Sequence, residues 1–163
     1  MPERAQLVDL TPGSAAVVAG WVPEPADVIQ FAGPSLTHPL TGEQLLAVAA
    51  DSHRWPKVLL VDGEPAAFGA LTFRPDDVRL GWVVTDPARR GRGLGRLLVT
   101  ELVELARAAR PQGPVTLGVY EHNTAARALY ADLGFVEAGE RQRRVVDGRE
   151  WVSLELVLVL SRG

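Results

Sequence analysis

The chain has 163 residues, of which 47% are hydrophobic and 23% are charged, as is usual for a globular domain. Its formal net charge of -3 argues against a general nucleic-acid-binding protein. It contains no cysteine, which excludes disulfide bonds, zinc bound by cysteine and an acyl-cysteine intermediate.

The first half of the sequence predicts short elements separated by turn residues. In chain order, we predict a strand over residues 5–10, a weak helix over 13–22, an irregular segment over 25–41, a helix over 42–51, and strands over 57–62, 66–73 and 78–85. Thr11 is placed to cap the first helix, and Pro25 follows its end. Asp62-Gly63 is a hairpin signal, so the three strands from 57 to 85 are expected to be antiparallel.

The second half begins with the clearest amphipathic helix of the chain, in which leucine and alanine recur at helical spacing. We predict this helix over residues 94–109, a strand over 115–120, a helix over 124–133, and strands over 135–146 and 150–160. Asp147-Gly148 is a second hairpin signal. This succession of elements predicts a mixed α/β (α+β) fold, and the length predicts a single domain over residues 1–163.

A segment rich in glycine and arginine, from Arg89 to Arg96, joins the strand ending at residue 85 to the long helix. Its alternating glycines allow consecutive main-chain N–H groups to point into one concavity, and the helix N-terminus adds partial positive charge. These features favour a diphosphate site. The segment lacks the Lys-Ser/Thr end of a Walker A loop, and Arg96 stands where a Rossmann fingerprint needs its third glycine. The alternative is a glycine-rich turn with solvated arginines.

Two motifs, in this order, resemble those of the GNAT acetyltransferase superfamily. Arg90-x-x-Gly93-x-Gly95, after a Val-x-Asp-Pro sequence, resembles the acetyl-CoA motif Gln/Arg-x-x-Gly-x-Gly/Ala. The segment from Asn123 to Phe135 is similar to the second motif, Asn-x-x-Ala-x-x-Leu-Tyr-x-x-x-Gly-Phe. The resemblance implies the GNAT fold: a central, mostly antiparallel, twisted sheet of six to seven strands flanked by about four helices, with two strands splayed apart at the acetyl-CoA site.

The resemblance implies acetyl-CoA as cosubstrate, and no metal. The backbone of Val83, Val84 and Thr85 would pair with the pantetheine arm, and a free N–H there would hold the thioester oxygen. The diphosphate would be held by Arg90, Gly91, Arg92, Gly93, Leu94, Gly95 and Arg96. Asn123 would contact the cofactor, although its sequence context also suits a helix N-cap.

The function that the resemblance implies is N-acetyl transfer to a primary amine by direct attack in a ternary complex. Tyr130 would protonate the departing thiolate, because a phenol with a pKa of about 10 is protonated at neutral pH. The alternative role of Tyr130 is that of a core aromatic residue. The strand over 78–84 contains no carboxylate, so Glu121, beside His122, is the candidate general base. Both residues also suit a solvated strand end.

The acceptor is less defined by the sequence, and a small-molecule amine, a protein N-terminus and a lysine are all compatible with it. Aromatic and histidine side chains that could line its pocket, or pack in the core, are Trp21, Phe31, His38, Trp55 and Trp82. Acidic residues that could attract a cationic acceptor, or remain solvated, are Glu24, Asp27 and Asp51.

The N-terminal residues lack the pattern of a signal peptide, and no apolar run approaches the roughly 20 residues that span a bilayer. We therefore expect a cytoplasmic protein without membrane or nucleic-acid partners, and homodimers are common in the family that it resembles. Two other functions stay open: a noncatalytic domain that binds or senses acetyl-CoA, and a binder of nucleotide phosphates.

Overall fold

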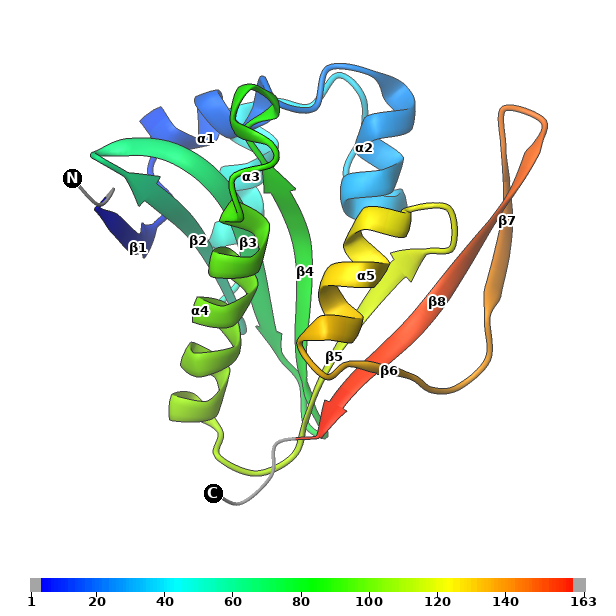
Figure 1. Ribbon diagram of the computed structural model, residues 1–163. Coiled ribbons are helices and arrows are strands. Elements are labelled where there is room, and N and C mark those ends of the chain that lie inside the picture. The colour runs from blue at the N-terminus through cyan, green and yellow to red at the C-terminus, as the bar shows by residue number, and fades with distance from the viewer. Residues whose placement is uncertain (1–3, 160–163) are drawn as a thin grey trace.

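The computed structural model describes residues 4–159, which form strands and helices in alternation (Figure 1). The helices are α1 (Pro12–Ala19), α2 (Pro25–Ala32), α3 (Gly42–Ala49), α4 (Leu94–Ala109) and α5 (Thr124–Asp132), with 3-10 turns η1 (Gly33–Ser35) and η2 (Pro87–Arg89). The strands are β1 (Ala5–Asp9), β2 (Arg54–Val61), β3 (Glu64–Phe73), β4 (Val78–Thr85), β5 (Pro114–Tyr120), β6 (Val136–Glu137), β7 (Gln142–Val146) and β8 (Arg149–Val159). Among these residues, no helix combines the length and the apolar character needed to cross a membrane.

All of these strands belong to one eight-stranded sheet with the order β1-β2-β3-β4-β5-β8-β6, and β7 also pairs with β8. Every pairing is antiparallel except that of β4 with β5, which is parallel. A parallel neighbour requires a crossover connection, and here α4 supplies it. The N-terminal half of α4 and the C-terminal end of β4 therefore lie at the same edge of the structure, as Figure 1 shows.

Helices cover both faces of the sheet and create two hydrophobic cores. The larger core packs α4 and α5 against the sheet through buried residues such as Leu98, Leu102 and Leu117. The second core packs α1, α2 and α3 against the other face through Val18, Phe31 and Phe68. Alternation along β3 and β4 sends successive side chains into these two cores, as the period of a strand requires.

The structure confirms the predicted mixed α/β class, the antiparallel arrangement of β2, β3 and β4, and the hairpin at Asp147-Gly148. It corrects two elements. Residues 25–32 form a helix, where we predicted an irregular segment, because Pro25 occupies the first helical turn, in which a missing N–H costs nothing. The predicted strand over 135–146 is divided into β6 and β7, with Gly139 at a φ of 74° between them.

These two differences explain the element counts. The described residues contain eight strands and five α-helices, against the expected six to seven strands and about four helices. The last residue of the predicted strand over 150–160, Leu160, lies outside the described residues.

Close packing of α4 on the sheet depends on Gly69 of β3. A Cβ at this position would lie 2.8 Å from Leu102 Cδ1 and 3.4 Å from Leu98 Cδ2. We expect Gly69→Val to lower the free energy of unfolding by about 1–3 kcal/mol, since overpacking displaces α4. Chemical denaturation measures this loss. Gly81→Val is the matched control, because a Cβ at Gly81 meets nothing within 4 Å. Equal losses in the two variants would contradict the packing argument.

Candidate active site

The site forms where β4 and β5 separate. Their parallel ladder contains only two residue pairs within the described chain, Val78 with Val115 and Arg79 with Thr116. Beyond these pairs the strands diverge, as Figure 1 shows. The β3–β4 register shifts between Phe68 and Ala70, which is the mark of a β-bulge, and Trp82 at this bulge has a φ of 54°. A positive φ is a strained conformation for a bulky residue, so the surrounding structure must hold it there.

The N-terminus of α4 lies beside the separated end of β4, and its composition favours the binding of an anion. Gly93 is its N-cap, with a φ of 75° and no side-chain hydrogen bond, and the first turn contains no acidic residue. The first N–H groups of a helix have no partner inside the helix. Among the other described α-helices, Thr11, Thr41 and Asn123 cap α1, α3 and α5, and Asp27 lies in the first turn of α2. Among the α-helices in the described part of the chain, only α4 has neither a side-chain cap nor an acidic residue in its first turn.

A cleft of about 670 Å³ runs between this helix end, β4 and α5. Most of the residues predicted to bind the cofactor line it: Val83, Val84, Thr85, Arg90, Gly91, Gly93, Leu94, Gly95 and Asn123. A Cβ at Gly91 or Gly93 would meet no atom within 4 Å, so the surface over these glycines is open. Arg92 and Arg96 are not in the lining, and the Arg96 guanidinium instead lies 2.8 Å from the Asp132 carboxylate.

Asn123 and Tyr130 of the second motif both face the cleft. The Asn123 side chain accepts a hydrogen bond from the Ala126 N–H at 3.4 Å and so caps α5, while it also lines the cleft. The two alternatives for Asn123 are therefore compatible. Tyr130 is only 6% exposed and contacts Phe135 edge-on, with 5.8 Å between the ring centroids. Burial raises the pKa of the Tyr130 phenol to about 12.

A small cavity of about 50 Å³, called the passage, adjoins both this cleft and a second cavity of about 390 Å³, called the acceptor-side cavity. The passage lies in the gap between β4 and β5. Val83, Asn123 and Tyr130 line both the cleft and the passage, whereas Trp82 and Tyr120 line both the passage and the acceptor-side cavity. The three cavities therefore adjoin one another in a row, called the route, from the uncapped helix end to the far side of the separated strands.

Glu121, the candidate general base, lies outside this route among the described residues. Its carboxylate is 2.7 Å from the Arg141 guanidinium, and its side chain is 46% exposed. This placement argues against a direct role in proton transfer, although the role itself stays a prediction. His122 stacks on Tyr120, with 5.7 Å between the centroids, and its Nε2 lies 2.9 Å from Gln30 Oε1.

The other candidates divide between the site and the rest of the fold. Trp21, Phe31 and Asp27 line the cleft, and Trp82 lines the acceptor-side cavity. The residues that do not line these cavities are His38, Trp55, Glu24 and Asp51.

Sequence reasoning missed Gln30 and Arg54. Gln30 lines the cleft, the passage and the acceptor-side cavity, but it lies in a segment that the sequence did not predict to be helical. Arg54 had no motif to mark it.

Comparison with known proteins agrees with this arrangement. A model of the acetyltransferase (GNAT) family matches residues 26–135. N-alpha-acetyltransferase RimI of Mycobacterium tuberculosis is 42% identical over 69 residues, which are 42% of this chain and 41% of that protein. This chain thus spans less than half the length of that curated relative.

Solved structures extend the likeness to nearly the whole chain. The ribosomal-protein-S18-alanine N-acetyltransferase of Escherichia coli has a TM-score of 0.73 at 25% identity, covering 98% of this chain and 96% of that one. A Salmonella typhimurium structure containing its cofactor acetyl-CoA has a TM-score of 0.79 at 20% identity, with the same coverages of 98% and 96%. From the family match, the fold and the two motifs that meet at one cleft, this chain belongs to the GNAT acetyltransferase family.

Proposed function

We propose that the protein transfers the acetyl group of acetyl-CoA to a primary amine by direct attack in a ternary complex. The observation that supports this most is the row of adjoining cavities: the cleft, the passage between β4 and β5, and the acceptor-side cavity. Such a route lets two substrates approach one reaction point from opposite ends. Release of the free CoA thiol in the presence of a panel of amines tests the proposal, and no release with any amine would reject it.

The cofactor end of the route fits a diphosphate through main-chain groups. Gly91 and Gly93 have φ values of 83° and 75°, so their N–H groups adopt orientations that other residues rarely reach. The free amides of the first turn of α4 add to this surface, and the helix dipole favours an anion there. Arg90 in the lining adds a full positive charge. Arg92 and Arg96 would contribute main-chain atoms at most.

The edge of β4 supplies the next contact. Val84 and Thr85 pair with β3 on one edge, but the β4–β5 ladder ends at Arg79. The main-chain groups from Gly81 to Thr85 that face β5 are therefore available to an extended ligand, in the manner of an added strand. The amide-containing pantetheine arm of acetyl-CoA has the required chemistry, and it would lead the thioester to the passage.

In the proposed reaction the amine nitrogen bonds to the thioester carbon and the carbon–sulfur bond breaks. Tyr130 lines the passage and, with a pKa of about 12, remains protonated over the whole physiological range. A thiol has a pKa of about 8.5, so complete transfer of the phenol proton to a thiolate would be uphill. Tyr130 would therefore stabilise the departing sulfur as a hydrogen-bond donor. The nitrogen loses one proton as the amide forms and the sulfur gains one, so the products are the amide and the free CoA thiol.

A noncatalytic domain that binds acetyl-CoA is the second candidate. It is favoured by one observation: the described residues that line the passage include no carboxylate to accept the amine proton. Tight binding of acetyl-CoA without thiol release across a broad amine panel would support it. The acceptor-side cavity argues for transfer, because a sensor has no use for an opening behind the thioester.

The diphosphate site makes a direct prediction for Gly93→Glu. The new side chain would place negative charge where the phosphates bind, so affinity for acetyl-CoA should fall by at least about tenfold, and the ligand should no longer raise Tm. Gly148→Glu is a matched control, since Gly148 has a φ of 76° and an equally open surface in the β7–β8 turn. Both variants carry the same backbone strain, and only the first should lose the ligand. Unchanged affinity in Gly93→Glu would remove the site.

Tyr130→Phe keeps the buried ring and removes the hydroxyl. We expect kcat to fall by about tenfold to 100-fold, the value of a hydrogen bond to a charged group, while acetyl-CoA affinity changes less than twofold. Tyr120→Phe removes the only other phenol of the chain and should act mainly on the KM of the acceptor, whose cavity Tyr120 lines. Full activity of Tyr130→Phe would show that the phenol has only a packing role.

The pH dependence follows from the groups along the route. An alkylamine with a pKa of about 10 is mostly protonated at pH 7, so kcat/KM should rise about tenfold per pH unit toward that value. The raised pKa of Tyr130 keeps its donor form intact, so activity should not fall from this cause below about pH 11.

A further inference from the structure

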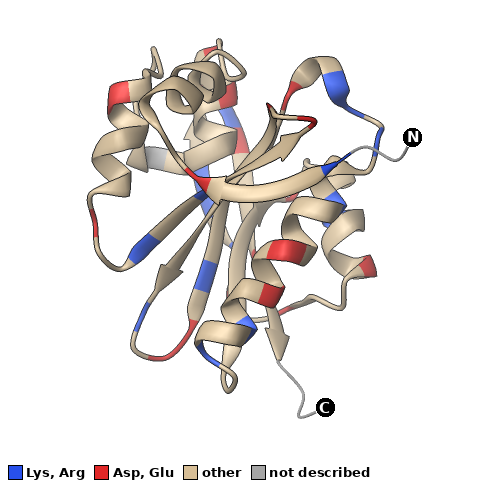
Figure 2. Ribbon diagram, turned by 90° about the vertical axis from the view of Figure 1, so that its left-hand side faces the viewer, with Lys and Arg blue, Asp and Glu red and all other residues tan. Residues whose placement is uncertain are grey.

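The acceptor-side cavity has basic walls. Arg54 of β2, Arg79 of β4 and Arg74 of the turn between β3 and β4 line it, and no carboxylate is present among the described lining residues. Figure 2 shows basic positions on the strands at the end of the sheet that α1, α2 and α3 leave uncovered. Gly118 of β5 leaves room for the Arg79 guanidinium, because a Cβ at Gly118 would come within 2.9 Å of Arg79 Nη2.

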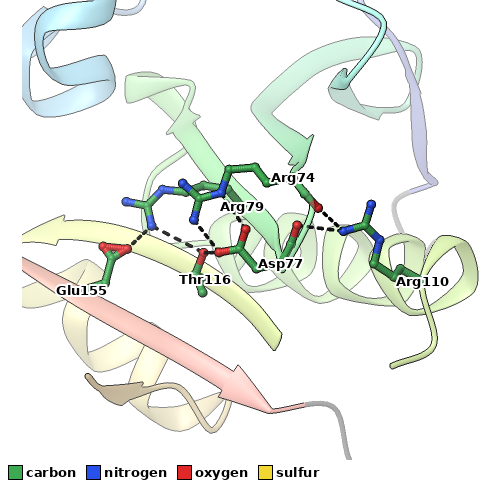
Figure 3. A network of polar contacts seen from close by, with 6 residues as sticks. All are labelled: Arg74, Asp77, Arg79, Arg110, Thr116 and Glu155. Atoms are coloured by element: carbon green, nitrogen blue, oxygen red, sulfur yellow. Dashed lines mark hydrogen bonds and ion pairs between the residues drawn. The ribbon is translucent and has the colours of Figure 1, made fainter. Parts of the chain in front are cut away.

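Two of the three arginines already have acidic partners (Figure 3). Arg79 forms an ion pair with Glu155 of β8, and Arg74 forms one with Asp77. The Asp77 carboxylate also accepts a hydrogen bond from Thr116 at 2.7 Å, and the hydrogen bond from Arg74 lowers the pKa of Asp77. The positive charges of Arg74 and Arg79 are therefore largely neutralised by these acidic partners.

Arg54 differs from them. Its Nε donates a hydrogen bond to Thr72 Oγ1 at 3.2 Å, and its guanidinium carbon lies 4.5 Å from the centroid of the Trp82 ring. Among residues 4–159, the structure shows no ion pair of Arg54 with a carboxylate. These two contacts hold the side chain in one position and leave its Nη groups free for a carboxylate or phosphate partner.

The Arg54 guanidinium lies close to the passage in which the proposed reaction would take place. Trp82, under the Arg54 guanidinium, lines both the passage and the acceptor-side cavity. A ligand anion bound at Arg54 would therefore lie next to the mouth of the passage. An amine on the same ligand, a few bonds away, could enter the passage and meet the thioester.

We propose that the acceptor is a primary amine that also carries a carboxylate or phosphate group, and that Arg54 binds this anion. The inference rests on the proposed acetyl transfer and specifies its substrate class. A cavity of about 390 Å³ is near the lower end of small-molecule sites, so it suits a small amino acid-like compound or the first residues of an acidic peptide. A polyamine would bring positive charge next to the Arg54 guanidinium and should be a poor acceptor.

Matched acceptor pairs test this substrate class. The small-molecule arm compares 4-aminobutyrate with 4-aminobutyramide and O-phosphoethanolamine with ethanolamine. The peptide arm compares a short peptide with Asp at its second position with the same peptide carrying Asn. Spermidine represents cationic acceptors. We expect the anionic member of at least one pair to have a kcat/KM at least about tenfold higher, and the arm that shows it identifies the source of the anion.

Variants of Arg54 connect the preference to this side chain. Arg54→Gln should reduce the anionic preference by about tenfold to 100-fold, mainly through the KM of the acceptor. Arg54→Glu should shift the preference toward spermidine. Arg143→Gln is the matched control, because Arg143 is exposed on β7, pairs with Glu150 at 2.6 Å and is not among the described lining residues of the cavity. Thermal protection by acetyl-CoA should be unchanged in all three variants, which verifies their folding.

The outcomes separate this inference from the proposed function. Turnover that is equal for both members of every pair, or an anionic preference that survives in Arg54→Gln, would overturn the inference and leave the acetyl transfer intact. Absence of thiol release with every amine would reject the transfer itself. In that case, calorimetric binding of 4-aminobutyrate and O-phosphoethanolamine to the CoA complex decides about Arg54: weaker binding in Arg54→Gln supports the anion site, and equal or absent binding rejects it.

Discussion

The geometry of the site depends on a parallel pairing that stops after two residue pairs. At the closed end, Thr116 of β5 bonds to Asp77 just before β4, and Arg110 after α4 donates to the Asp77 carbonyl at 3.0 Å (Figure 3). At the open end, the bulge at Trp82 turns the β4 backbone away from β5. Because β4 and β5 are held together at one end and diverge at the other, the gap between them forms the passage within a single sheet.

The two ends of the route differ in the groups that would recognise the proposed ligands. On the cofactor side, main-chain amides and glycine conformations dominate, so recognition depends on how the backbone folds. On the acceptor side, the walls come from α2, η1 and the strands β2, β3, β4, β5 and β8, and they include the side chains of Arg54 and Trp82. A change of one such side chain can alter the acceptor without disturbing the cofactor site. This division is physically consistent with a family that keeps one cosubstrate on a fold that can accept varied amines.

Local signals in the sequence account for the residues that it placed together and that the structure brings to one cleft. Gly91 and Gly93 act through their own backbone angles, and Asn123 acts on the helix that it begins, so each leaves a trace in neighbouring residues. Arg54 and Gln30 become important only when strands and helices far apart in the sequence meet. Glu121 shows why local signals are not sufficient. The sequence predicted its place after β5, but not its ion pair with Arg141, 20 residues further along the chain.

The bare first turn of α4 also has a consequence for the lifetime of the protein. Without a cap or an acidic residue, the sixteen-residue helix begins with unsatisfied amides when no anion is present. The bound diphosphate would act as the missing cap and suppress local opening of the segment from η2 to α4, the kind of opening through which proteases gain access. Abundance of the protein would then follow the supply of the ligand that carries this diphosphate, even with synthesis held constant.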